Sequence, residues 1–192
     1  MKNLRSTLWV GSTYCHIEKV VKNMLDLPYS LPRPMAIYRK ENCLLTPGEY
    51  IENPWYFSAL LVSSYDVEIV VFVYRLGEPF NPYPPATAGA FNRDVIGVLI
   101  IQNSVSDNLW HQIEEAQHIL ELAGAMNICI VVDEIGDSIC EELSITCDKS
   151  GFIYGYNALR DMLITKCPLH SNHLRLLMKR AFCIVVRKLV NI

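Results

Sequence analysis

The chain has 192 residues, of which 51% are hydrophobic and 19% charged, and its formal net charge is −3. This balance is typical of a globular protein that can bury a sizeable core, and it does not suggest a nucleic-acid-binding surface. No apolar run is long enough to span a membrane, and the first residues, MKNLRSTLWVG, lack the pattern of a signal peptide. We therefore expect a cytoplasmic protein that binds neither nucleic acid nor membrane. Its seven cysteines are scattered without C-x-x-C spacing, which favours reduced, mostly buried thiols over metal or disulfide roles.

Strand and helix signals alternate in the first part of the chain. An apolar strand is predicted over Leu4 to Val10, ending at Gly11, and apolar residues at helical spacing predict a helix from about His16 to Leu25. Three prolines between residues 28 and 34 then indicate a loop, because proline cannot continue a regular helix. The residues from Met35 to Leu45 are predicted to form a second strand.

A capped helix and a buried strand are predicted in the middle of the chain. Asn53 is a good N-cap and Pro54 suits the first helical position, so a helix is predicted to run from Pro54 to Ser64. Val67 to Tyr74 is a nearly continuous apolar run rich in β-branched residues, as expected of a strand covered on both faces. The side chains expected to point inward from the helix are Trp55, Ala59, Leu60 and Val62.

A proline-rich segment, Gly77 to Asn92, follows this strand. It is too long for an ordinary connection, so we interpret it as an exposed lid, a partner-binding loop around Tyr83, or a plain solvent loop. The elements predicted after it are a strand over Val95 to Ile101, a helix from Ser106 or Asp107 through Leu122, a strand over Asn127 to Val132, and short helices over Ser138 to Leu143 and Tyr156 to Ile164. The inward stripe predicted for the long helix is Leu109, Ile113, Ala116, Leu120 and Ala123.

The alternation of strands and helices predicts an α/β fold. Three layers are expected, α/β/α, around a mostly parallel, doubly wound sheet. The last segment, His173 to Val190, is apolar almost all round with basic residues interspersed. It is predicted either to close the sheet as a core helix or to dock on another protein.

Three features together resemble a known family. They are the sequence Thr46-Pro47-Gly48-Glu49-Tyr50, the helix after it and the strand VEIVVFVY. The resemblance is to the EutP/PduV family, small Ras-like P-loop proteins of the ethanolamine- and propanediol-utilisation microcompartments, and it covers about residues 4–145. It implies a P-loop NTPase fold of the small-GTPase type over residues 1–165, with residues 166–192 as a C-terminal helical extension. In that family the turn reads D-T-P-G-E-Y, and here the aspartate position is Leu45.

The first strand–helix turn departs from the phosphate-loop pattern G-x-x-x-x-G-K-[ST]. Gly11 fits the first position, but the later three positions hold His16, Ile17 and Glu18. The motif lysine neutralises phosphate charge and the second glycine lets the backbone wrap the phosphates. Ile17 supplies no charge, and Glu18 adds a negative charge whose repulsion in a partly buried site is on the order of several kcal/mol.

The other motifs that the resemblance implies are also altered. Leu45 replaces the aspartate that would hold magnesium, although Gly48 is kept. The base-reading loop should follow the strand that ends at Ile101, yet Gln102-Asn103-Ser104 offers neither the lysine nor the aspartate, and Asp107 lies too far along. Asp133-Glu134 is acidic without a basic neighbour. These independent losses favour a degenerate site with no magnesium–nucleotide cofactor, no catalytic residue and no metal site. The vestigial nucleotide-binding residues are then Gly11, Ser12, Thr13, Thr46 and Gly48.

Other groupings of reactive side chains have simpler explanations. Cys15 beside His16 could form a nucleophile–base pair, but adjacent side chains point apart and no third group is evident. Glu49 and Glu52 could be acid–base groups, and the simpler explanation is that acids favour the first turn of a helix. The histidines are interpreted as solvated or capping residues rather than metal ligands; they are His16, His111, His118, His170 and His173.

Two classes of function follow from the altered motifs and the resemblance. The first is a microcompartment-associated pseudo-GTPase that acts through contacts with a shell or cargo protein, or as a homo-oligomer, in ethanolamine- or propanediol-type catabolism. Its candidate surfaces are the proline-rich loop and the C-terminal helix. The alternative is a nucleotide-binding enzyme, a GTPase or an acetate-kinase-like phosphotransferase, with ATP or GTP and magnesium bound by an altered loop. On that alternative Lys19 or Lys22 would supply the missing charge.

Overall fold

The described residues build one mixed sheet between helices. The computed structural model describes residues 4–102, 109–133 and 156–164, in which six strands lie in the order β2-β3-β1-β4-β5-β6. Every neighbouring pair is parallel except β2 and β3 at the edge. This order, with its antiparallel edge strand, fits the small-GTPase type of P-loop fold. The strands are β1 (Thr7–Gly11), β2 (Tyr38–Lys40), β3 (Cys43–Leu45), β4 (Ile69–Arg75), β5 (Asp94–Gln102) and β6 (Ile128–Asp133).

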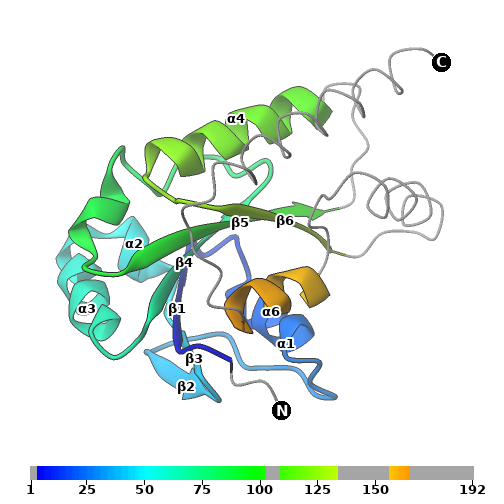
Figure 1. The fold of residues 1–192 in the computed structure, drawn as a ribbon. Helices are drawn as coiled ribbons and strands as arrows, with labels where there is room; N and C mark the ends of the chain where they lie inside the picture. Colours follow the sequence, from blue (N-terminus) through cyan, green and yellow to red (C-terminus); the bar gives the residue numbers. More distant parts are fainter. Residues whose placement is uncertain (1–3, 103–108, 134–155, 165–192) are drawn as a thin grey trace.

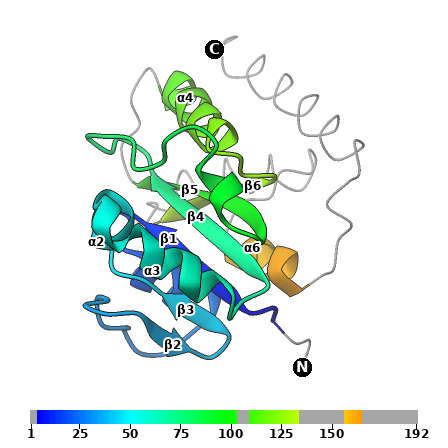
Figure 2. The same cartoon turned by 90° about the vertical axis from the view of Figure 1, so that its left-hand side faces the viewer.

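Helices cover both faces of the sheet, so the predicted three layers are confirmed (Figures 1 and 2). On one face α3 and α4 pack over a core that contains Leu60, Phe72 and Leu120, and on the other α1 and α6 pack over Trp9 and Val71. Nearly every strand residue of β1 and β4 is buried, as strands covered on both sides must be. The helices are α1 (Ile17–Met24), α2 (Glu49–Glu52), α3 (Pro54–Ser64), α4 (Leu109–Leu122) and α6 (Tyr156–Ile164), with a 3-10 turn η1 at Thr87–Ala90.

The predicted single strand over 35–45 is wrong. The chain forms two short antiparallel strands, β2 and β3, that reverse direction at Glu41-Asn42. Glu41 takes a left-handed conformation with φ of 50°, which closes the tight turn. Because no glycine or proline marks this reversal, the local pattern predicts one strand where there are two.

The helix α3 begins and ends as predicted, but its inward face is not the expected one. The Asn53 side chain accepts a hydrogen bond from the Trp55 N–H, as an N-cap should. Leu60 is fully buried, whereas Trp55 is 87% and Val62 is 68% exposed. Because this helix is apolar on almost every side, the spacing of its apolar residues could not select the buried face.

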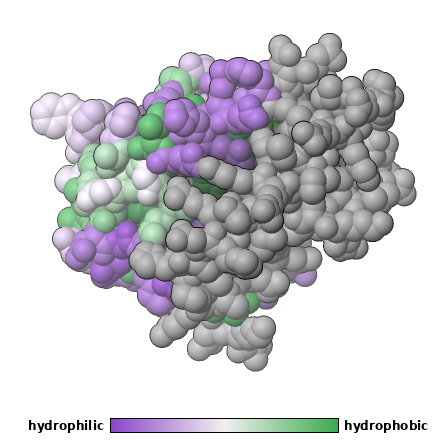
Figure 3. All heavy atoms as spheres, turned by 45° about the horizontal axis from the view of Figure 1, so that its top comes forward, coloured by the Kyte–Doolittle hydropathy of each residue, from purple (hydrophilic) through white to green (hydrophobic). Residues whose placement is uncertain are grey.

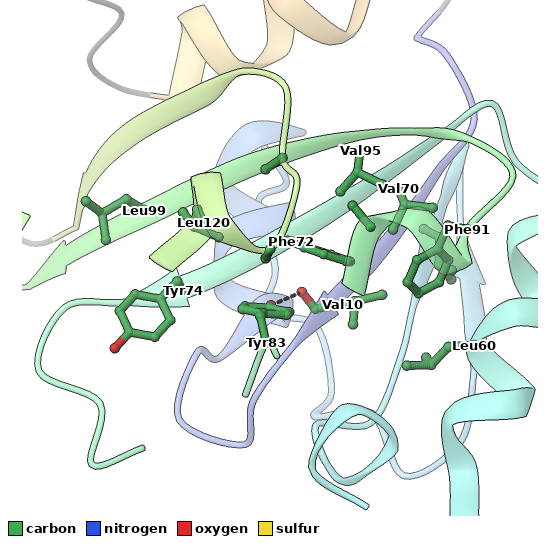
Figure 4. Packing of buried hydrophobic residues seen from close by; sticks show 14 of the residues in the cluster. Val10, Leu60, Val70, Phe72, Tyr74, Tyr83, Phe91, Val95, Leu99 and Leu120 are labelled. Atoms are coloured by element: carbon green, nitrogen blue, oxygen red, sulfur yellow. Dashed lines mark hydrogen bonds between the residues drawn. The ribbon is translucent and has the colours of Figure 1, made fainter. Parts of the chain in front are cut away.

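The proline-rich segment is anchored in the core, which overturns the interpretation of Tyr83 as part of an exposed loop. Tyr83 is 1% exposed and its ring stacks on Phe72 with centroids 4.6 Å apart. Its hydroxyl lies 2.9 Å from the Val10 carbonyl oxygen and 2.7 Å from that of Val73, tying the segment to β1 and β4 (Figure 4). Phe91 is also buried. The tyrosine among these prolines is therefore a packing residue, not an exposed partner contact.

The later elements agree with the prediction wherever they are described. Ile113, Ala116, Leu120 and Ala123 of the predicted α4 stripe are buried, and α6 has its predicted bounds. Among the described helices, none combines the length and apolar character needed to span a membrane. The predicted helix over 138–143 and the segments 166–192 and 173–190 lie outside the described residues.

Candidate functional site

Two loops meet at the carboxyl ends of β1 and β3, where a nucleotide would be expected. The register Trp9↔Leu45 sets the turn after Gly11 beside Thr46-Pro47-Gly48. Of the five predicted site residues, four line one pocket and Gly11 ends β1 behind it. The residues around the pocket are Ser12, Thr13, His16, Ile17, Glu18, Arg33, Pro34, Thr46 and Gly48.

The backbone of Gly48 lies directly against the first loop. A Cβ atom at this position would lie 2.3 Å from the Thr13 nitrogen and 2.6 Å from the Ser12 carbonyl carbon. Because these are backbone atoms, no side-chain adjustment can relieve the contact. Glycine is therefore required at Gly48 by close packing of the two loops, without reference to any ligand.

The N–H groups of the loop are bonded within the protein. The Thr13 N–H donates to Oε1 of Glu52 at 2.6 Å, and the Tyr14 N–H donates to the Ser12 hydroxyl at 3.2 Å. The Cys15 N–H donates to the Ser12 carbonyl oxygen at 3.1 Å. In a phosphate loop such groups bind phosphate oxygens. Here three consecutive N–H groups already have protein acceptors.

The remaining space and its charge do not suit a triphosphate. The pocket has a volume of about 10 Å³, which is roughly room for one water molecule. Glu18 is 8% exposed, and its carboxylate lies 3.3 Å from Nδ1 of His16. His16 holds a left-handed conformation with φ of 49°, at the position where the motif has glycine. The residues present therefore do not fit magnesium–nucleotide in this conformation.

Basic and metal-anchoring groups are placed differently from the motif. Arg33 lines the pocket and lies 3.9 Å from the Glu49 carboxylate, whereas Lys19 is exposed on α1 and does not line it. Leu45 is fully buried in the core beneath α1. The Thr46 hydroxyl donates to the Trp9 carbonyl oxygen at 2.8 Å, so it serves to hold β3 to β1.

Cys15 is a buried structural thiol. It is 2% exposed, and its Sγ lies 3.0 Å from the Val73 carbonyl oxygen and 2.8 Å from Oε1 of Glu78. Burial raises the pKa of the Cys15 thiol well above its ordinary value, and the Glu78 carboxylate raises it further. A thiol held in its neutral form and bonded to Glu78 is not a nucleophile paired with His16.

Glu78 brings a second carboxyl group to the loop. It accepts hydrogen bonds from the Cys15 thiol and from the Arg75 N–H at 3.1 Å, while its buried Oε2 has no hydrogen-bond partner among the described residues. Burial raises the pKa of Glu78, and the charge of Glu52 contributes to the rise. The folded protein therefore holds the Glu78 proton more tightly than the unfolded chain does.

This shift predicts a pH dependence of stability. A group whose folded pKa is raised stabilises the fold below its unfolded value, about 4.5, and that contribution is lost as pH rises through the folded pKa. We expect the unfolding free energy of the wild type to fall relative to Glu78→Gln as pH rises from about 4 to about 8. Urea unfolding across this range measures the difference. The exposed variant Glu121→Gln should keep the wild-type pH profile, and a parallel Glu78→Gln profile would contradict the prediction.

Two residues of the site, Glu78 and Arg33, could not be predicted from the sequence, and neither could the bond that Glu52 makes. Glu52 fits a first-turn acid or an acid–base group, and nothing in a single sequence indicates which backbone its side chain reaches. Within residues 4–102, 109–133 and 156–164 no cluster of three or more His, Cys, Asp or Glu side chains could hold a metal ion. The predicted base-reading positions Asn103, Ser104 and Asp107 lie outside the described residues, as does Glu134.

Comparison with known proteins identifies the family. The family model described as "Ethanolamine utilisation - propanediol utilisation" (PduV-EutP) matches residues 5–147. Propanediol utilization protein PduV of Citrobacter freundii is 29% identical over 96 residues, covering 50% of this chain and 64% of PduV. The solved apo structure of translation elongation factor SelB from Methanococcus maripaludis is 13% identical and covers 80% of this chain and 37% of SelB. Its TM-score is 0.38, which is too low to support a fold assignment, so the assignment rests on the strand order. Since the family model matches most of the chain, the protein belongs to the PduV-EutP family.

Proposed function

We propose that the protein is a pseudo-GTPase that acts through protein contacts in ethanolamine- or propanediol-type catabolism, in association with a bacterial microcompartment. The observation that carries the proposal is the bonded state of the loop. Its N–H groups at Thr13, Tyr14 and Cys15 have protein acceptors, and the pocket that Thr13 lines has a volume of about 10 Å³. A triphosphate would have to displace these bonds before it could bind.

The charges around the loop support the same conclusion. Ile17 stands where the motif lysine would neutralise phosphate, and the buried Glu18 carboxylate lines the pocket. At a separation of about 4 Å and an effective dielectric of about 20, two like charges repel by roughly 4 kcal/mol. This repulsion would weaken phosphate binding by several hundredfold or more, about 1.4 kcal/mol accounting for each factor of ten.

The exposed face of α3 supports the protein-contact part of the proposal. Trp55 is 87%, Val62 is 68% and Tyr65 is 64% exposed, and no charged residue occurs between Pro54 and Ser64. Pale and green atoms gather on the left of the molecule in Figure 3, and α2 and α3 lie on the left in Figure 1. An exposed apolar face with aromatic side chains suits an apolar segment of a shell or cargo protein.

A nucleotide titration and a binding assay test the two parts of the proposal. In calorimetry with GTP or ATP and magnesium, the 192-residue protein should give no saturable heat at ligand concentrations up to about 1 mM. When it is mixed with purified shell and cargo proteins, one of them should be retained by the wild type and lost with Trp55→Ser. Because Trp55 is exposed, this variant should unfold within about 0.5 kcal/mol of the wild type. Magnesium-dependent nucleotide binding would refute the first part, and equal retention by Trp55→Ser would refute the use of α3.

One observation favours the alternative of a GTPase or acetate-kinase-like phosphotransferase. Arg33 lines the pocket, so a guanidinium could replace the motif lysine if the loop opened. Its present neighbour is the Glu49 carboxylate at 3.9 Å, with both side chains more than half exposed. Phosphoryl transfer that disappears in Arg33→Ala would support this alternative over the pseudo-GTPase.

A further inference from the structure

We propose that Glu52 is a tethered anion that takes the place of a phosphate oxygen on the loop and latches α2 against it. The inference rests on the proposed function, because it explains how the loop is kept closed to nucleotides. It goes further in assigning the closure to one side chain that can be removed. The Glu52 carboxylate thus occupies the anion-binding position of the loop, and we call this contact the latch.

The contact has the properties of an anion bound to a loop N–H. Oε1 of Glu52 lies 2.6 Å from the Thr13 nitrogen, across 39 positions of sequence. A hydrogen bond this short from a backbone N–H to a carboxylate is charge-assisted and stronger than one between neutral groups. The Thr13 N–H lies in the turn from β1 into α1, the same place from which P-loop proteins bind phosphate. The carboxylate therefore supplies negative charge where a ligand would.

Both ends of α2 are fixed to this loop. The preceding residue, Gly48, packs its backbone on Ser12 and Thr13, and the last residue, Glu52, bonds the Thr13 N–H. The helix has only four residues, so it has little internal stability of its own. Its position therefore depends on these two contacts and on the packing of Tyr50 against Tyr56 of α3. Removing the Glu52 carboxylate should release one end of α2 and free the Thr13 N–H.

A neighbouring acidic side chain bears on the strength of the contact. The Glu78 carboxyl is close enough to feel the Glu52 charge, and Glu18 lines the same pocket as Thr13. When Glu78 is ionised, its repulsion with the Glu52 carboxylate opposes the bond at Thr13. The strength of the latch is therefore expected to depend on the ionisation of Glu78.

The test compares the 192-residue wild type with Glu52→Ala, Glu52→Gln and a matched control, Glu49→Ala. Glu49 lies on the same short helix, but its carboxylate is more than half exposed and pairs with Arg33. In Glu52→Ala, hydrogen exchange of the Thr13 amide should become about tenfold faster or more, and the melting temperature should fall by about 3–10 °C. Inorganic phosphate should then raise the melting temperature of Glu52→Ala more than that of the wild type or Glu49→Ala. Comparison with Glu49→Ala corrects for the general stabilisation that phosphate gives to folded proteins.

The outcomes separate this inference from the proposed function. Unchanged Thr13 exchange in both Glu52 variants, an equal loss in Glu49→Ala, or no selective gain with phosphate would each overturn the latch, even if the wild type does not bind GTP. Tight GTP binding by the wild type would instead overturn the proposed function. If Glu52→Ala does not fold, Glu52→Gln keeps an acceptor without the charge, and its Thr13 exchange alone decides the question.

Discussion

Gly48→Ala is expected to destabilise the protein by about 3 kcal/mol or more. An added Cβ would lie 2.3 Å from the Thr13 nitrogen, and its neighbours are backbone atoms that cannot rotate away. The φ of −62° at Gly48 is one that alanine adopts readily. On backbone preference alone the substitution would stabilise the protein by about 0.4–1 kcal/mol. The clash reverses that sign.

Gly89→Ala is the matched control for this prediction. Nothing lies within 4 Å of a Cβ added at Gly89, so the same change should leave the unfolding free energy within about 1 kcal/mol of the wild type. Urea unfolding of the two variants measures the difference. If Gly48→Ala were as stable as Gly89→Ala, the close packing of residues 12–13 on Gly48 would be wrong.

Tyr83 is the second position where a large effect is expected. Tyr83→Ala should cost about 3–5 kcal/mol, because it removes a buried ring that stacks on Phe72. Tyr83→Phe keeps the ring and should cost about 1–2 kcal/mol, because the hydroxyl bonded to the Val10 and Val73 carbonyl oxygens is lost. The two substitutions thus separate the packing of the ring from its hydrogen bonds.

Thermal or urea unfolding of both Tyr83 variants provides the measurement. Tyr65→Phe is the control, since Tyr65 is 64% exposed and the change should stay within about 0.5 kcal/mol of the wild type. A neutral result for Tyr83→Ala would mean that the proline-rich segment is not anchored on the sheet. That result would restore the interpretation of 77–92 as an exposed partner-facing loop.

The fold could be predicted from the sequence because the strongest local signals agree with the tertiary structure. The β-branched run Val67–Tyr74 forms the central strand β4, and Asn53-Pro54 begins α3 as expected. Local signals do not determine which side chains are buried, because burial depends on long-range packing. The uncharged α3 turns Trp55 outward, and Tyr83 turns inward although prolines surround it.

The candidate site was only partly predictable for the same reason. The motif pattern predicted that the lysine and the aspartate are missing, because Ile17 and Leu45 stand at their positions. The predicted residues Ser12, Thr13, Thr46 and Gly48 do line one pocket. The same pattern could not predict that the Glu52 carboxylate reaches the Thr13 N–H, 39 positions away. A bond of that kind depends on how α2 lies against the loop, which no local pattern specifies.

The rings of Tyr50 on α2 and Tyr56 on α3 stack with centroids 5.3 Å apart and an interplanar angle of 21°. Since Asn53 alone joins the two helices, this stack makes them one rigid unit that carries both Glu52, bonded at Thr13, and the exposed Trp55. A partner at Trp55 would act on the Thr13 contact only if it favoured one position of these two helices over another, so the stack of Tyr50 on Tyr56 is the link that such coupling would need.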